Sequence, residues 1–338
     1  MRKMATIRKI DAINPIEGAD AIEVATVGGW KVVVKKGEYS AGDLAVYCEI
    51  DSWIPTELAP FLSKGKEPRE YEGIKGERLR TVKLRGQLSQ GLLLHRYTAL
   101  DHVGRIVEGM DVSELLGIIK WEMQIPAQLA GQAKGNFPSL IPKTDQERVQ
   151  NLKKEIEGLG NMHFEVTEKL EGSSMTCYLI DGEFGVCSRN LDLKRDENNS
   201  FWATAVAEDI EAKMRAVSES ASNWNFAIQG ELIGPGIQGN IYKLTKPQFH
   251  VFDVYDISDG EYLFPFNRRN LIERMGLKHV PVLNPSYLLT LSIEDLLKSA
   301  EGQSWLHKTD REGIVFKQVD GHMTFKAISN HYLIKQKS

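Results

Sequence analysis

Short apolar runs separated by glycines make up the first hundred residues, and this pattern limits the possible folds more than any other feature. Two of the runs are residues 31–35 and 45–50, and the pattern continues at 78–84 and 91–95. Runs of this length between glycine turns are typical of β-strands, and helical periodicity is scarce among them. Residues 4–97 therefore predict a small all-β barrel or sandwich, and we prefer an OB-type barrel.

Four cations lie close together near the end of this region, namely Arg78, Arg80, Lys83 and Arg85. On an unbroken strand the first two would share one face and the last two the other, because side chains alternate. Such cations bind phosphates with salt-dependent affinity. Charged side chains also protect an exposed edge strand from pairing with another chain. The sequence leaves both interpretations open.

The chain has 338 residues, more than one ordinary core contains, so we expect two domains. We assign residues 1–130 to an OB-like β-barrel with its linker and 131–338 to a second domain.

Three cysteines without metal-ligand spacing fit a reducing compartment. No apolar run approaches the ~20 residues that span a bilayer, and the first residues lack a signal core. We therefore expect an intracellular protein with no membrane partner, in either cytoplasm or nucleus.

The net charge of −4 argues against general, nonspecific binding of nucleic acid but allows a local basic track. Between the two domains, residues 112–119 predict a short helix and residues 131–142, which are rich in glycine and proline, predict a linker.

A capping box follows the linker. Thr144 and Glu147 have the spacing with which two side chains satisfy the free backbone donors of a helix start. Apolar residues at helical spacing follow, and Gly158 is a plausible end. Lys143 and Arg148 lie beside this predicted helix start, where backbone amides favour anions. They are either an anion site or ordinary flanking residues.

The second half of the sequence mixes strands and helices without strict alternation. We expect strands at 175–178, 184–188, 226–233, 249–255, 313–317 and 323–326, and helices at 201–218, 268–275 and 293–300. The pattern predicts an α+β domain, and the sequence contains no Walker or G-x-G-x-x-G phosphate loop.

The stretch Lys169-Leu170-Glu171-Gly172 follows the apolar-alternating residues 163–167. Gly172 allows a sharp turn and a close approach to a ligand. The Lys169 amine is a nucleophile only without its proton, so catalysis requires that its pKa fall toward neutrality. By itself this stretch is equally consistent with a structural lysine that ends a strand before a turn.

Five further stretches follow in a set order: Ser188-Arg189-Asn190, Gly230-Glu231-Leu232, Phe252-Asp253-Val254-Tyr255-Asp256, Glu312-Gly313-Ile314-Val315-Phe316-Lys317 and Phe325-Lys326. With Lys169 they resemble the nucleotidyltransferase domain of ATP-dependent polynucleotide ligases and capping enzymes. The whole chain more narrowly resembles RNA ligases of the Deinococcus and Naegleria type, in which an OB domain precedes that domain. This resemblance implies a mixed α+β catalytic domain built on antiparallel sheets.

The resemblance assigns the catalytic steps to Lys169, Lys326 and Lys317. Lys169 would attack the α-phosphorus of ATP and carry AMP, and the other two would neutralise phosphates. Glu312 would hold Mg²⁺ or Mn²⁺, hard cations that favour carboxylate and water. The superfamily usually has a second lysine two residues after the one at 326, but Ile328 stands here. Lys335 or Lys317 is the candidate replacement.

The nucleotide would contact nine further residues: Glu168, Leu170, Arg189, Asn190, Glu231, Phe252, Val315, Lys143 and Arg148. Arg189 has a planar fork suited to ribose or phosphate oxygens, and Glu231 offers acceptors for ribose hydroxyls. Phe252 would form a wall of the adenine pocket, although core packing explains it equally well. Lys143 and Arg148 would orient the leaving pyrophosphate.

The function implied is an ATP-dependent RNA ligase that seals 3′-OH and 5′-phosphate RNA ends at nicks in duplexes and acts as a monomer. One alternative is a capping-type guanylyltransferase, which would use GTP; capping enzymes usually place the OB module after the lysine domain. Another is a non-catalytic nucleic-acid-binding protein on a ligase scaffold. Lys169, Glu231, Glu312 and Lys326 argue against it, since such a protein has no need of all four.

Overall fold

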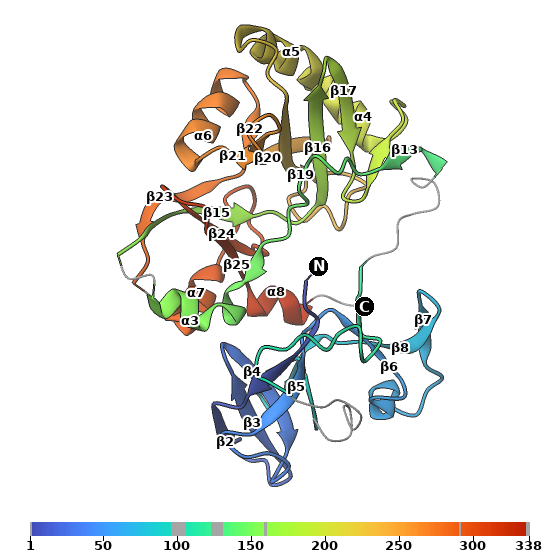
Figure 1. Ribbon diagram of the computed structural model, residues 1–338, viewed down its shortest axis with the longest axis vertical. Helices are drawn as coiled ribbons and strands as arrows, with labels where there is room; N and C mark the ends of the chain where they lie inside the picture. Colours follow the sequence, from blue (N-terminus) through green and yellow to red (C-terminus); the bar gives the residue numbers. More distant parts are fainter. Residues whose placement is uncertain (1, 96–105, 123–130, 159–160, 291, 336–338) are drawn as a thin grey trace. The chain divides into compact units, whose positions relative to one another are not determined.

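The computed structural model describes residues 2–95, 106–122, 131–158, 161–290 and 292–335 (Figure 1). The chain divides into two compact units. The first comprises Met1–Gln124, Gln150–Lys153 and Leu333–Ser338, and the second comprises Ile125–Val149 and Lys154–Tyr332. The boundary at residue 130 stays a prediction. No helix among the described residues is long and apolar enough to span a membrane.

The first unit is built from short strands, as its glycine spacing predicts. Its strands are β1 (Ala5–Lys9), β2 (Ala12–Pro15), β3 (Ile22–Val27), β4 (Trp30–Lys35), β5 (Leu44–Cys48), β6 (Ser52–Pro55), β7 (Arg69–Tyr71), β8 (Ile74–Arg78), β9 (Thr81–Leu84), β10 (Gln87–Gln90), β11 (Leu92–His95) and β12 (Ile119–Lys120), with the 3-10 helix η1 at Pro60–Ser63. They form sheets in the orders β1-β5-β11, β2-β3-β4 and β12-β6-β8-β7, with a hairpin of β9 and β10. The predicted all-β fold of this region is confirmed.

The core of this unit is continued by residues that come much later in the chain. The Trp30 indole Nε1 donates to Asn151 Oδ1 at 2.7 Å, and Asn151 Nδ2 donates to Glu49 Oε2 at 3.1 Å. At Gly29, a Cβ atom would lie 2.7 Å from the Gln150 Cα atom, closer than real Cβ contacts. The segment Gln150–Lys153 therefore packs against the β3–β4 turn, and the turn needs a glycine there.

The four predicted surface cations do not lie on one continuous strand. β8 ends at Arg78 and β9 begins at Thr81, so the predicted alternation of faces is interrupted at Leu79-Arg80. Arg78 pairs with Asp51 at 2.6 Å, and its guanidinium carbon lies 3.8 Å from the centre of the Trp121 ring. The helix predicted at 112–119 is also wrong, because this segment forms turns that lead into β12.

The second unit contains two sheets. The larger has eight strands, in the order β13-β18-β17-β16-β19-β20-β21 with β22 beside β20, and the smaller has five in the order β14-β25-β24-β15-β23. Their bounds are β13 (Ala133–Asn136), β14 (Glu147–Arg148), β15 (His163–Lys169), β16 (Ser173–Ile180), β17 (Glu183–Cys187), β18 (Leu191–Leu193), β19 (Phe226–Ile233), β20 (Gln248–Asp256), β21 (Glu261–Tyr262), β22 (Lys278–His279), β23 (Val282–Leu288), β24 (Gly313–Gln318) and β25 (Thr324–Ile328). All pairs are antiparallel except β14 with β25 and β20 with β22, which confirms the predicted α+β class.

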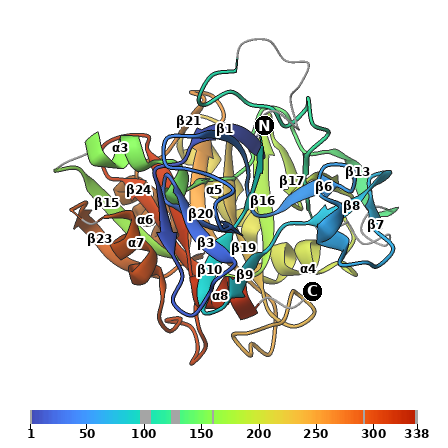
Figure 2. The ribbon, with the colours of Figure 1, turned by 90° about the horizontal axis from the view of Figure 1, so that it is seen from below.

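Helices cover one face of the larger sheet (Figures 1 and 2). Trp202, Met214 and Ile272 bring α4 (Ser200–Ala207), α5 (Ile210–Ser220) and α6 (Pro265–Arg274) into one buried cluster with the sheet. The other helices of the described residues from 149 onward are η2 (Val149–Asn151), α3 (Lys153–Gly158), α7 (Ile293–Ala300) and α8 (Asn330–Lys335).

Three predictions about this unit are wrong in detail. The helix predicted at 201–218 is two helices, because Asp209 adopts a positive φ of 53° between them. The predicted linker at 131–142 contains β13, which pairs with β18. The capping box at Thr144 begins no helix, since Glu147–Arg148 is extended and pairs with β25; the α-helix begins only at Lys153.

Candidate active site

One face of the five-stranded sheet gathers cations from three distant parts of the sequence. Lys169 lies opposite Gly313, Thr167 opposite Val315, and Val315 opposite Lys326. Arg148 on β14 continues this row beyond Lys326. Because paired residues share a face and residues two apart along a strand share it too, Lys169, Lys326 and Arg148 face the same side.

The larger sheet contributes Glu231 from β19, held near the turn that follows Lys169. A Cβ atom on Gly172 would lie 2.4 Å from the Leu232 carbonyl oxygen and 2.9 Å from Glu231 Cγ. Only glycine permits this approach. The turn between β17 and β18 carries Arg189 and Asn190. Gly172 thus brings the Lys169 turn close to the strand that carries Glu231.

Lys169 is paired with a carboxylate. Its Nζ lies 2.7 Å from Glu312 Oε1, and the two side chains are 26% and 15% exposed. Burial acts to lower the pKa of Lys169, but Glu312 and Glu231 outweigh it, so the pKa is raised. The sequence analysis requires this pKa to fall toward neutrality for catalysis, whereas the neighbouring carboxylates raise it here. Lys169 therefore carries its proton until the charge on these carboxylates is reduced.

The carboxylates around Lys169 fit a divalent cation. Burial, and then the charge of Glu312, raise the pKa of Glu231 to about 8 despite nearby Lys169. Burial and Glu312 also raise the pKa of Glu171. No group of three or more His, Cys, Asp or Glu side chains among the described residues forms a complete metal site. Mg²⁺ and Mn²⁺ commonly take one or two carboxylates and complete their shell with water and phosphate, so the donors present are sufficient.

A second cluster surrounds Lys326. Its Nζ lies 3.1 Å from Asp145 Oδ1, and Arg189 NH2 lies 3.9 Å from Asp145 Oδ2. Lys143 Nζ donates to Asn190 Oδ1 at 2.8 Å. Lys143 and Arg189, predicted from separate stretches, therefore lie close together. A phosphate that displaced Asp145 would meet several cations at once.

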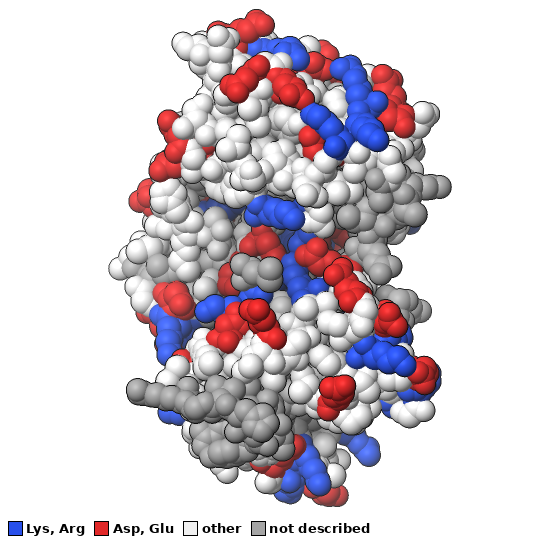
Figure 3. All heavy atoms as spheres, turned by 45° about the vertical axis from the view of Figure 1, so that its right-hand side comes forward, with Lys and Arg blue, Asp and Glu red and all other residues white. Residues whose placement is uncertain are grey.

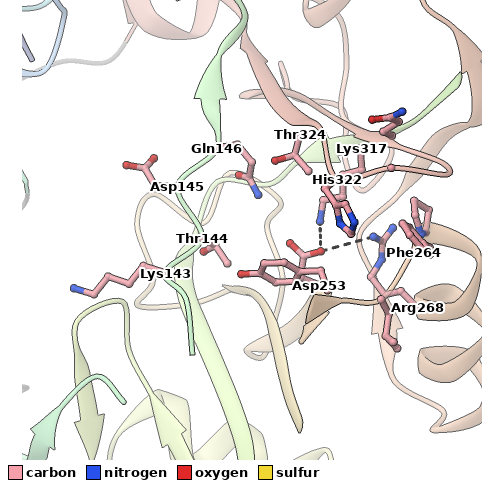
Figure 4. A pocket seen from close by; sticks show the side chains of 15 residues that line it. Lys143, Thr144, Asp145, Gln146, Asp253, Phe264, Arg268, Lys317, His322 and Thr324 are labelled. Atoms are coloured by element: carbon pink, nitrogen blue, oxygen red, sulfur yellow. Dashed lines mark ion pairs between the residues drawn. The ribbon is translucent and has the colours of Figure 1, made fainter. Parts of the chain in front are cut away.

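Lys317 faces the larger sheet and is held there (Figure 4). Its Nζ lies 2.5 Å from Asp253 Oδ1 and donates to the Phe252 carbonyl at 2.6 Å. Burial lowers the pKa of Lys317 to about 8, although Asp253 opposes this. The contact to the Phe252 backbone ties the two sheets together inside this unit.

Arg268 extends the network around Asp253. Its NH1 lies 3.7 Å from Asp253 Oδ1, its NH2 donates to Glu165, and its Nε donates to His279 Nε2 at 3.0 Å. Burial, and then Arg268, lower the pKa of His279 to about 3, so the ring is neutral. The sequence analysis missed this network, because Glu165 and Arg268 are 103 positions apart and neither belongs to a motif. Asp145 was also missed, although it stands inside the Lys143–Arg148 stretch.

The remaining predicted nucleotide-binding residues do not all lie together. Leu170 and Phe252 belong to one apolar cluster with Val280 and Leu306, and Val315 is buried on the smaller sheet. Glu168 alternates to the face opposite Lys169, where its Oε2 accepts from the Trp305 backbone at 2.9 Å. Burial raises the pKa of Glu168. Its position supports the strand end that presents Lys169.

Charges of both signs are interleaved on the face drawn in Figure 3, without a large patch of one sign. This distribution agrees with the net charge of −4.

Comparisons with known proteins find the same two parts. A model of an OB-fold domain matches residues 4–96, and the RNA ligase model matches residues 162–335. The solved structure of Naegleria gruberi RNA ligase with PPi is 45% identical over 98% of both chains, with a TM-score of 0.90. A lysine-to-alanine variant of the same enzyme with ATP and Mn is 46% identical over 98% of both chains, with a TM-score of 0.91. A lysine-to-methionine variant with AMP and Mn gives the same values. No curated protein matches the chain.

Proposed function

Since the chain belongs to the RNA ligase family, we propose that this ATP-dependent enzyme seals 3′-OH and 5′-phosphate ends at nicks in duplex RNA. It does so as a monomer, through AMP bound to Lys169 and then to the RNA end. The observation that carries the proposal is Lys169, held 2.7 Å from Glu312 on a sheet face shared with Lys326 and Arg148. One chain supplies all of these groups.

In the first step Lys169 Nζ attacks the α-phosphorus of ATP. A nitrogen–phosphorus bond forms, the bond to the bridging oxygen breaks, and pyrophosphate leaves. The nearest acceptor for the Lys169 proton is Glu312. A divalent cation held by Glu312 would neutralise that carboxylate and polarise the α-phosphate. The chain's own contribution is to hold the amine beside the α-phosphorus, while Lys326 binds the α-phosphate.

The other residues divide between the parts of the nucleotide. Lys143 and Arg148 orient the β- and γ-phosphates, and Lys326 binds the α-phosphate. Glu231, Arg189 and Asn190 take the ribose and its phosphate oxygens. Leu170, Phe252 and Val315 enclose the adenine, with Glu168 behind them. Lys317 supports the Phe252 backbone, to which it donates a hydrogen bond at 2.6 Å.

Two further transfers complete the reaction. An oxygen of the RNA 5′-phosphate attacks the phosphorus of Lys169-AMP, and Lys169 leaves as the amine after taking back a proton. The RNA 3′-OH then attacks the 5′-phosphate, its proton is released, and AMP leaves. Each displacement needs the entering and leaving groups on opposite sides of phosphorus, so RNA enters from the side that pyrophosphate left.

The first prediction tests the nucleophile. Lys169→Ala should abolish the label that the protein takes up from α-labelled ATP with Mn²⁺ and that survives denaturation. The loss should exceed the ~10²- to 10⁴-fold effect of a general acid or base, because no other group can carry the AMP. Lys308→Ala, an exposed lysine, is the control. Full labelling of the alanine variant would rule out Lys169, and labelling by GTP in place of ATP would favour a capping-type guanylyltransferase.

The second prediction concerns the metal. Glu312→Ala should reduce labelling at limiting Mn²⁺ by ~10²-fold or more, because the cation loses a charged ligand and the α-phosphate its polarising partner. The melting temperature should stay close to that of the unaltered protein, since the side chain lies at the site rather than in the apolar core. Glu294→Gln, an exposed carboxylate on α7, is the matched control. Normal rates at limiting metal would exclude Glu312 as the metal residue.

A further inference from the structure

A cavity of about 190 Å³ opens in the second unit, lined by Lys317 and Thr324 of the five-stranded sheet (Figure 4). Its walls come from the segment before β14, the β20–β21 region, the start of α6 and the β24–β25 hairpin. The nucleotide roles proposed above leave it unused, apart from Lys143 at its edge and Lys317 in its floor.

Strand register fixes the position of this cavity relative to the reacting groups. Lys169 lies opposite Gly313, whereas the cavity residue Thr324 lies opposite Lys317, four residues further along β24. Four residues of strand span roughly 13 Å. Lys326 lies between the two ends, opposite Val315. The order along this face is therefore Lys169, Lys326 and then the cavity.

The order of Lys169, Lys326 and the cavity matters because the reaction proceeds by in-line displacement at phosphorus. When a 5′-phosphate displaces Lys169 from phosphorus, it approaches from the side away from the amine. The nucleotide that carries that phosphate must then continue in the same direction. With the α-phosphate bound by Lys326, as proposed above, the cavity lies on that side, because Thr324 lies beyond Lys326 along the face.

The lining suits a nucleotide better than a free phosphate. The floor holds the buried and mutually paired side chains of Lys317, Arg268 and Asp253. The sides carry neutral hydrogen-bonding groups, from Thr144, Gln146, Gln318 and Thr324. At the rim, the rings of Phe264 and His322 lie 5.6 Å apart, and Phe264 is 38% exposed. Two carboxylates in the lining oppose a bare anion, whereas exposed aromatic faces and amides suit a base and its sugar.

We propose that this cavity binds the 5′-terminal nucleotide of the RNA strand that receives AMP, with Phe264 and His322 against its base or ribose. The proposal rests on the proposed function and adds a subsite to it. It predicts that this rim acts after adenylylation of Lys169 and not during it.

The test uses the full-length protein already carrying AMP on Lys169. Phe264→Ala should raise the RNA concentration needed for half-maximal AMP transfer to a 5′-phosphorylated nicked duplex at least about fivefold, the lower end of an aromatic contact to one base. Labelling of Lys169 by ATP should be unchanged. Phe266→Ala is the matched control, because Phe266 is 61% exposed on α6 but does not line the cavity.

A second variant fills the cavity instead of trimming its rim. Thr324→Trp introduces a large ring at an exposed lining position and should weaken the same transfer while ATP labelling persists. Equal losses in ATP labelling and in AMP transfer would overturn the proposal, because the cavity would then serve ATP. Normal AMP transfer to the RNA in both Phe264→Ala and Thr324→Trp would also overturn the proposal.

The strand assignment is checked by photocrosslinking. A duplex with 4-thiouridine at the 5′-phosphate terminus should crosslink to a peptide that contains Phe264 or His322, and one with the probe at the 3′-OH terminus should not. The reverse result assigns the cavity to the other strand and contradicts the proposal. Failure of the unaltered protein to label with ATP would instead refute the proposed function, so the two failures are distinguishable.

Discussion

Lys169 and Lys317 lie on the same face of one sheet, yet their neighbours shift their pKa values in opposite directions. Two carboxylates, Glu312 and Glu231, outweigh the burial of Lys169 and raise its pKa. Lys317 has Asp253 beside it but also Arg268, and burial dominates, so its pKa falls to about 8. In this state Lys169 is therefore held protonated between its carboxylates, whereas Lys317, which contacts the Phe252 backbone, loses its proton more readily.

The lowered pKa of Lys317 predicts a dependence of stability on pH. Between about pH 8 and pH 10.5, the folded state binds fewer protons at this site than the unfolded state. The free energy of unfolding should therefore rise with pH across this window relative to Lys317→Met, which cannot titrate. Melting temperatures of both proteins from pH 7 to pH 9.5 measure the difference.

Lys308→Met provides the control for that series, because Lys308 is exposed. If the difference between the unaltered protein and Lys317→Met stayed constant with pH, the lysine would titrate as it does in the unfolded chain.

At the scale of elements, the β15–β16 turn determines how the nucleophile meets the larger sheet. Ser174 pairs with Glu231, and Gly172 lies against Leu232 and Ile233. This close packing leaves no room for a side chain at 172. Alternation along β15 then places Lys169 toward the site and Glu168 toward the Trp305 backbone.

Gly172→Ala should therefore impair both stability and chemistry. Its Cβ would meet the Leu232 carbonyl oxygen at 2.4 Å, so the turn must move. We expect a loss of about 1–3 kcal/mol in unfolding free energy and weaker ATP labelling, measured by denaturant titration and the labelling assay. Gly135→Ala is the control, since a Cβ there meets no atom within 4 Å. Equal behaviour of the two variants would contradict this account of the turn.

At the scale of the whole molecule, the two units are interleaved in sequence. The segment Gln150–Lys153 belongs to the first unit, while Arg148 belongs to the second. Trp30 and Glu49 supply the partners of Asn151. A chain without the barrel therefore loses the contacts that fix the segment directly after Arg148.

Deletion of residues 1–130, the proposed first domain, should therefore impair adenylylation of Lys169 more than the sealing of RNA that already carries AMP on its 5′ end. Lys143 and Arg148 are proposed to orient pyrophosphate, which is absent from the later step. Rates of both steps for one truncated protein decide the matter. Equal or greater loss on pre-adenylylated RNA would instead assign the barrel, with Arg78, Arg80, Lys83 and Arg85, the task of gripping RNA.

The sequence alone determined those features of the fold that depend on residues close together along the chain. Glycine spacing predicted the all-β first unit, and residue pattern predicted the α+β class of the second. The helix at 293–300 was also predicted, and Ser292 caps it by accepting a hydrogen bond from the Asp295 backbone. The six motifs, Lys169 among them, identified the ligase family, because residue types and their order along the chain can be read without a structure.

Tertiary structure decided what depends on strand register and on competition between local and distant partners. The Thr144 capping box is a valid local pattern, but pairing of Glu147–Arg148 with β25 keeps that backbone extended. Lys317 contacts the Phe252 backbone, 65 positions away, and Asp145 contacts Lys326, 181 positions away. No local sequence pattern encodes such pairs, because the partners are distant in sequence and come into contact only when the domain has folded.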